Sequence, residues 1–155
     1  MSLKNKINQY PTKELAPVIC EFLNQGKNVV LTARGNSMRP MLRNLKDNLT
    51  ISPCNHSELK VGDVVFYKRK SGIFVVHRIV GVLPSGEYLL MGDFQLRIEN
   101  VVPSQIFGKV TSFTRGKKTY SVCDKKYLKY ANFWVKTRFW RRAYMSFSYR
   151  TGQIK

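Results

Sequence analysis

Apolar and polar positions alternate over short runs through most of the chain, which is typical of β-strands with turns between them. Seven such runs, rich in β-branched and aromatic residues, cover residues 28–33, 48–52, 63–68, 73–82, 88–91, 107–114 and 119–122. Turn residues separate them, as at Ser71-Gly72, Pro84-Ser85-Gly86 and Arg115-Gly116. The pattern predicts a mainly β fold, built as an antiparallel sheet or a partly open barrel.

A helical period replaces the strand pattern near the N-terminus. Apolar residues recur every three or four positions, at Leu15, Val18, Ile19, Phe22 and Leu23. Pro11-Thr12 precede this stretch and Gly26 follows it, as expected of a capped helix with a glycine stop. We therefore predict an N-terminal helix, with Pro17 within its first turns.

A second helical pattern lies at the C-terminal end and changes face partway along. Between Lys125 and Arg150 there are eight Lys or Arg and no acid. The same segment has nine aromatic residues, which include both tryptophans of the chain. At about 100° per residue, the apolar sector of the first half becomes the basic sector of the second half, with the exchange near Thr137. One straight helix cannot bury both apolar faces on one surface, so we predict a kink, two helices or a partner that contacts each half.

The charge of the chain indicates an anionic partner. Lys and Arg number 27 against nine acids, which gives a net charge of +18. A membrane surface, a nucleic acid and an acidic peptide all fit this excess. No apolar run approaches the roughly 20 residues of a spanning helix, and no signal-peptide core follows Met1, so we expect a cytoplasmic protein. The three cysteines have no paired metal spacing and are expected to be reduced.

Candidate chemistry begins with a serine on a turn and a histidine in a strand. Ser37 stands in Gly35-Asn36-Ser37-Met38-Arg39-Pro40-Met41-Leu42, directly after an apolar run. His77 stands in Phe74-Val75-Val76-His77-Arg78-Ile79-Val80, a strand that is apolar on both faces and is therefore expected to be central. Burial favours neutral imidazole, the form that a general base needs. Either residue alone is more often a turn residue or a core polar group than a catalytic one.

Four boxes in order carry a resemblance to a known family. Gly35 to Leu42 resembles the Ser-Met-x-Pro-x-Leu box of type I signal peptidases and the related LexA-like self-cleaving repressors. Val61-Gly62-Asp63-Val64-Val65, Val76-His77-Arg78-Ile79-Val80 and Met91-Gly92-Asp93 resemble the boxes that follow it. The second catalytic box holds lysine or histidine in this superfamily, and here it resembles the histidine type. The resemblance covers about residues 28–112.

The resemblance implies a reaction and its residues. Ser37 corresponds to the nucleophile and His77 to the base that takes its proton, through an ester on Ser37 and without metal or cofactor. An acidic third member is expected to be Glu99, six residues after the Gly-Asp box, with Asp93 as the rival. Gly35 departs from the family, because many signal peptidases carry a hydroxyl there as an oxyanion donor; the Ser37 backbone N–H then acts alone or with another group.

Other candidates for chemistry are weaker. His56 follows Pro53-Cys54-Asn55 in a polar stretch and is expected to be an exposed loop histidine, and Cys54 is too isolated to form a metal pair with it. Lys68 and Lys70 are alternatives to His77 as the base, but their place before Ser71-Gly72 favours a solvated hairpin.

The preferred function is therefore that of a small serine endopeptidase without a spanning anchor. Residues 1–124 would form the peptidase-like domain with its N-terminal helix, and residues 125–155 a basic, aromatic appendage for an anionic membrane surface. Its partner would be a peptide or protein substrate, at a site in the cytoplasm or on the inner membrane face. The alternative is a non-catalytic peptide-binding or membrane-surface module of the same fold. Nucleic-acid binding is the third choice because no reader motif is found, and the oligomeric state stays open.

Overall fold

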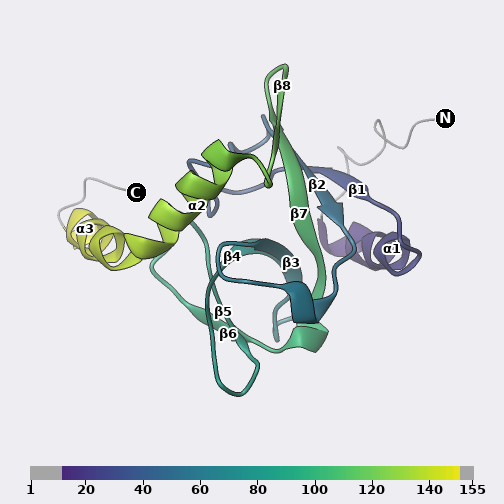
Figure 1. Ribbon diagram of the computed structural model, residues 1–155, viewed down its shortest axis with the longest axis horizontal. Helices are drawn as coiled ribbons and strands as arrows, with labels where there is room; N and C mark the ends of the chain where they lie inside the picture. Colours follow the sequence, from purple (N-terminus) through teal and green to yellow (C-terminus); the bar gives the residue numbers. More distant parts are fainter. Residues whose placement is uncertain (1–11, 151–155) are drawn as a thin grey trace.

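The computed structural model describes residues 12–150 and shows a mainly β chain with one helix before the sheet and two after it (Figure 1). The helices are α1 (Thr12–Asn24), α2 (Lys125–Lys136) and α3 (Arg138–Arg150). The strands are β1 (Val29–Thr32), β2 (Asn48–Ser52), β3 (Val64–Lys68), β4 (Phe74–Val82), β5 (Tyr88–Met91), β6 (Glu99–Val101), β7 (Ile106–Arg115) and β8 (Lys118–Ser121).

All eight strands belong to one antiparallel sheet that does not close. Their order is β1-β2-β7-β3-β4-β5-β6, and β8 also pairs with β7. The N-terminal helix and the seven strands expected from the sequence are confirmed, each strand within one residue at either end. Strand β6, which carries Glu99, was not predicted because it is three residues long and lies between β5 and a 3-10 turn. Of the two predicted alternatives, an antiparallel sheet or a partly open barrel, the structure shows an antiparallel sheet that is not closed.

Successive residues of a strand point to opposite faces, so the sheet buries two cores. On β3, Val64 and Phe66 join one core, together with Ile19 and Leu23 of α1 and Tyr127 of α2. Residues Val65 and Tyr67 of the same strand join the other core. β4 lies between β3 and β5 and is central, as predicted. His77 and Arg78 are consecutive residues of β4, so their side chains point to opposite faces of the sheet.

The C-terminal segment forms two helices that meet at Thr137, the position where the sequence pattern changes face. Helix α2 buries Tyr127, Ala131 and Val135 against the rest of the protein. In Figure 1, α1 lies at one end of the molecule beside β1, and α3 lies at the opposite end. No helix within residues 12–150 is long and apolar enough to cross a bilayer.

Candidate active site

Ser37 lies on a loop after β1 that is fixed from several sides. Inside the loop, Leu42 N–H donates to the Met38 carbonyl, and Gly35 N–H donates to Asn44 Oδ1. Met38, Met41 and Leu42 are all at most 5% exposed in the first core and anchor the loop on the sheet. Gly35 has a φ of +83°, which few other residues adopt. The loop therefore presents Ser37, which is half-buried, from a backbone held by packing and hydrogen bonds.

The backbone of Ser37 lies directly against the turn that follows β5. Phe94 N–H donates to the Ser37 carbonyl at 2.8 Å. A Cβ placed on Gly92 would come within 2.7 Å of the same carbonyl oxygen, closer than real Cβ atoms approach. Glycine at position 92 is therefore what allows the Ser37 loop and this turn to touch.

His77 lies on β4, next to the strand that leads into this turn. β4 and β5 are antiparallel, and the last pair of their register joins Arg78 to Met91, the residue before Gly92. His77 is 1% exposed, and burial lowers the pKa of its imidazole to about 4, although the nearby Glu99 carboxylate opposes the shift. At neutral pH the ring is uncharged.

Tyr67, Glu99 and Arg69 surround the other side of the imidazole. Tyr67 Oη lies 3.0 Å from His77 Nδ1, and the nearest Glu99 oxygen lies 3.8 Å from the same nitrogen. Burial first, and then the charge and hydrogen bonding of Glu99, raise the pKa of Tyr67, so its hydroxyl stays protonated. Burial by itself would raise the pKa of Glu99, but the Arg69 guanidinium holds this pKa below its usual range. Glu99 is therefore an ionised strand residue, not a solvated loop charge.

The tautomer of His77 depends on which group accepts the Tyr67 hydroxyl proton. If Tyr67 donates its proton to Glu99, its oxygen accepts from Nδ1–H, and the lone pair of His77 stays on Nε2. At 3.8 Å the Glu99 oxygen is too distant for a direct hydrogen bond to Nδ1, so Glu99 acts on the ring through Tyr67 and through its charge.

Asp93, the rival to Glu99, is engaged elsewhere. Its two carboxylate oxygens accept from Arg78 at 2.8 and 2.7 Å, and one of them also accepts from Tyr130 Oη at 3.2 Å. Arg78 and Asp93 are 0% and 2% exposed. The Asp93 carbonyl accepts from Trp134 and Arg141. Asp93 therefore links the Gly92 turn to β4 and to both C-terminal helices and makes no hydrogen bond to His77 among the described residues.

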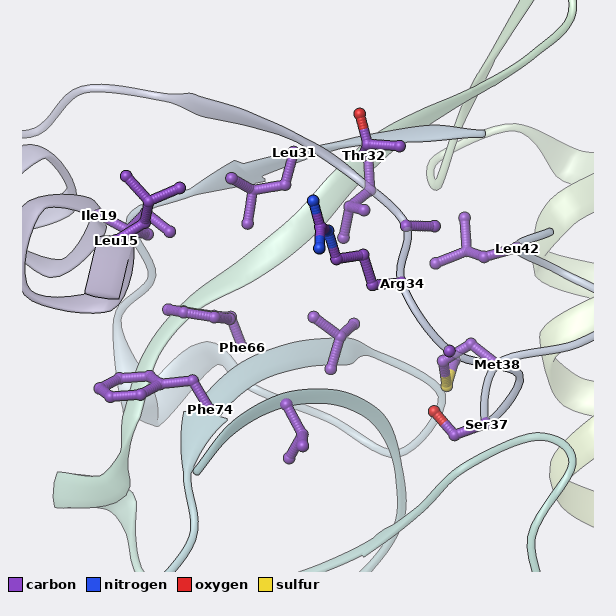
Figure 2. A pocket seen from close by; sticks show the side chains of 15 residues that line it. Leu15, Ile19, Leu31, Thr32, Arg34, Ser37, Met38, Leu42, Phe66 and Phe74 are labelled. Atoms are coloured by element: carbon purple, nitrogen blue, oxygen red, sulfur yellow. The ribbon is translucent and has the colours of Figure 1, made fainter. Parts of the chain in front are cut away.

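No hydrogen bond joins the side chains of Ser37 and His77 within residues 12–150. His77 points to the second core, with Tyr67, whereas the pocket that Ser37 lines is on the side of the first core and does not include His77. The Ser37 N–H donates no hydrogen bond to another described residue. Figure 2 shows the Ser37 hydroxyl directed into the pocket rather than away from it. This pocket holds about 130 Å³ and is lined largely by apolar side chains, among them Leu31, Phe66, Phe74 and Val76 (Figure 2).

The other candidate residues make structural contacts or lie at the surface. The prediction that His56 is exposed is wrong: it is half-buried in a 3-10 turn (His56–Glu58), and its Nε2 lies 3.0 Å from the Ile106 carbonyl oxygen. Lys68 and Lys70 are exposed at the β3–β4 hairpin, as predicted. Among residues 12–150, no three His, Cys, Asp or Glu residues gather as metal ligands.

Tyr67 and Arg69 are the site residues that sequence reasoning missed. The indication was present, since the tight Ser71-Gly72 turn fixes the hairpin register and puts Tyr67 on the same face as His77. Comparison with models of known protein families and with curated proteins finds no match for the chain.

Proposed function

We propose that this chain is a serine peptidase similar to type I signal peptidases of the histidine type, with Ser37 as nucleophile and His77 as general base. One observation supports this most directly: a buried, neutral imidazole, bonded through Nδ1 to Tyr67, lies on the strand next to β5, and the glycine that follows β5 packs against Ser37. A position in the cytoplasm or at the inner membrane face is part of the proposal.

In the proposed reaction, Ser37 Oγ attacks the scissile carbonyl while His77 Nε2 takes the hydroxyl proton. The imidazolium then gives this proton to the departing amine, leaving an ester on Ser37 that water hydrolyses with His77 again as base. The pair must come to about 3 Å for this transfer, and catalytic contacts in unliganded enzymes commonly shorten only when substrate binds. Glu99, through Tyr67, stabilises the imidazolium that forms.

The developing oxyanion needs hydrogen-bond donors. Gly35 has no hydroxyl, so the donor proposed is the backbone N–H of Ser37, which donates no hydrogen bond to another described residue. The loss of one donor of this kind lowers a rate by about 10²-fold or more, so we expect a modest turnover.

The proposed substrate is a peptide in extended conformation. Strand β1 has β2 as its neighbour on one side and is the end strand of the sheet, so its outer edge can accept a peptide backbone. The pocket beside Ser37, about 130 Å³ and mostly apolar, suits one small or medium apolar side chain next to the cleaved bond.

Covalent labelling tests the proposal. Intact-mass measurement after treatment with a serine-reactive phosphonate should show one adduct, which Ser37→Ala abolishes and His77→Gln slows by about 10²-fold or more. The matched control is Ser85→Ala, at an exposed turn serine, which should label as the parent protein does. Equal labelling of Ser37→Ala and the parent would contradict the assignment.

A non-catalytic peptide-binding module is the second candidate, favoured by the missing hydrogen bond between Ser37 and His77. This alternative predicts that a peptide ligand is bound and recovered intact, with no adduct across a broad pH range. The same mass measurement separates the two functions.

A further inference from the structure

Helix α3 shows its apolar face to the outside, which is the reverse of a usual surface helix. Four large aromatic side chains on it are exposed: Phe139 at 66%, Trp140 at 80%, Tyr144 at 66% and Phe147 at 64%. At about 100° per residue these four fall in one sector of the helix, together with Ala143. We call this sector the aromatic face.

The inward side of α3 is fixed by its arginines. Arg138 donates to the Val80 carbonyl at 3.0 Å, and Arg141 donates to the Asp93 carbonyl at 2.8 Å. The Arg141 guanidinium also stacks 4.1 Å from the Trp134 ring centroid. Because these cations hold the helix to β4 and to the Gly92 turn, the aromatic face is held outward. Rotation of α3 to bury it would break both arginine contacts.

The helix that precedes α3 is cationic on its exposed side. The exposed side of α2 carries Lys125, Lys126, Lys129 and Lys136, with Phe133 among them at 60% exposure. No acid occurs between residues 125 and 150, and the whole chain has a net charge of +18. Aromatic rings beside lysines match the boundary layer of an anionic bilayer, where rings lie among headgroups and cations meet phosphate.

We propose that the aromatic face of α3, with the exposed lysines of α2, docks the protein on the surface of an anionic lipid bilayer. A second copy of the chain fits less well, because two equally cationic surfaces repel each other. A nucleic acid fits less well because Arg138 and Arg141 of α3 already donate to backbone carbonyls of the protein.

Vesicle binding by the full chain tests the proposal. The probe is a vesicle of about seven parts phosphatidylcholine to three parts phosphatidylglycerol, compared with pure phosphatidylcholine. We expect sedimentation with the anionic vesicles, with apparent affinity roughly 10-fold or more above that for the neutral ones and falling with added salt. Brominated acyl chains should quench tryptophan emission, because Trp140 is 80% exposed on the aromatic face.

The variant Phe139→Ser with Trp140→Ser should lower the affinity at least about 10-fold. Its matched control is Ile73→Ser with Val82→Ser, which removes two exposed apolar side chains at 50% and 48% exposure from the sheet and should bind as the parent does. Thermal melting by circular dichroism shows whether both variants are folded. If the α3 variant is not folded, quenching of tryptophan emission in the parent protein by brominated acyl chains is the deciding measurement.

Several results would overturn the proposal: no vesicle binding by the parent protein, an equal loss in the control, binding without quenching by brominated chains, or a concentration-dependent dimer that only the α3 variant loses. Binding of single-stranded DNA in place of vesicles would overturn it as well. None of these readouts requires peptidase activity, so failure here and failure of the proposed function are separate outcomes.

Discussion

Tyr67 Oη and His77 Nδ1 lie 3.0 Å apart across the hairpin formed by β3 and β4. The register pairs Val65 with His77 and Tyr67 with Val75, so the two rings are diagonal neighbours on one face of the sheet. Both side chains are at most 1% exposed. A hydrogen bond in so dry a setting has few competing partners and fixes how the imidazole is turned.

Replacing Tyr67 by Phe should disturb His77 without disturbing the fold. We expect Ser37 labelling to slow by roughly 10- to 100-fold, because the tautomer is no longer held and Glu99 is no longer linked to the ring. Nitrogen NMR of the two histidines should show a mixed tautomer at His77.

The control for that change is Tyr88→Phe, which removes another buried tyrosine hydroxyl, one bonded to the His56 carbonyl at 2.6 Å. It should cost about 1 kcal/mol of unfolding free energy, as Tyr67→Phe does, yet leave labelling unchanged. Equal labelling rates in both variants would remove Tyr67 from the site.

Gly92→Ala should displace Ser37. The added methyl group would lie 2.7 Å from the Ser37 carbonyl oxygen, so the loop must move. We expect a loss of about 1–3 kcal/mol in unfolding free energy and about 10²-fold in labelling rate.

Gly108→Ala offers a comparison with the same kind of clash, 2.7 Å from the Ser52 carbonyl, away from Ser37. It should be similarly unstable in urea titrations but label normally in its folded fraction. A normal rate in Gly92→Ala would show that contact with this turn does not position Ser37.

Asp93→Asn should strongly destabilise the protein. It leaves the 0% exposed Arg78 guanidinium without its charged partner, and breaking a buried pair in this way costs about 3–5 kcal/mol. Urea unfolding of Asp63→Asn is the control, since Asp63 is 3.9 Å from the partly exposed Lys109 amine and should contribute about 1 kcal/mol or less. Similar losses in both variants would mean that the Arg78 pair is hydrated in solution.

Acid should weaken the fold through His77. Its folded-state pKa of about 4 lies below the usual 6.5, so the unfolded chain binds the extra proton first. Protonation of His77 does not affect the free energy of unfolding above about pH 6.5. Below this pH the free energy of unfolding falls, and at pH 4 it is lower by roughly 3 kcal/mol. Denaturant titrations from pH 7 to pH 4 should show this loss.

In His77→Gln the part of that loss between pH 6.5 and 4.5 should be greatly reduced, while the part caused by carboxylates below pH 4.5 should persist. An unchanged pH dependence in His77→Gln would show that His77 is not buried as a neutral group.

Local elements could be predicted from the sequence alone. Alternation of apolar residues predicted seven strands, and the three- to four-residue period predicted α1. The change of face near Thr137 predicted a kink, two helices or a partner for each half, and the structure has two helices. These features depend on contacts between residues near in the chain, where spacing alone carries the information. Strand β6 was missed because three residues are too few to show a period.

Only the tertiary structure decided which distant groups meet. The sequence favoured Glu99 over Asp93 as the acid beside His77 but could not decide between them; in the structure a Glu99 oxygen lies 3.8 Å from His77 Nδ1, and Asp93 pairs with Arg78. The docking of α3 directs Arg138 and Arg141 toward backbone carbonyls and leaves four aromatic rings of this helix exposed. The physical reason is that register and helix docking are set by the packing of the whole core, which no single segment encodes.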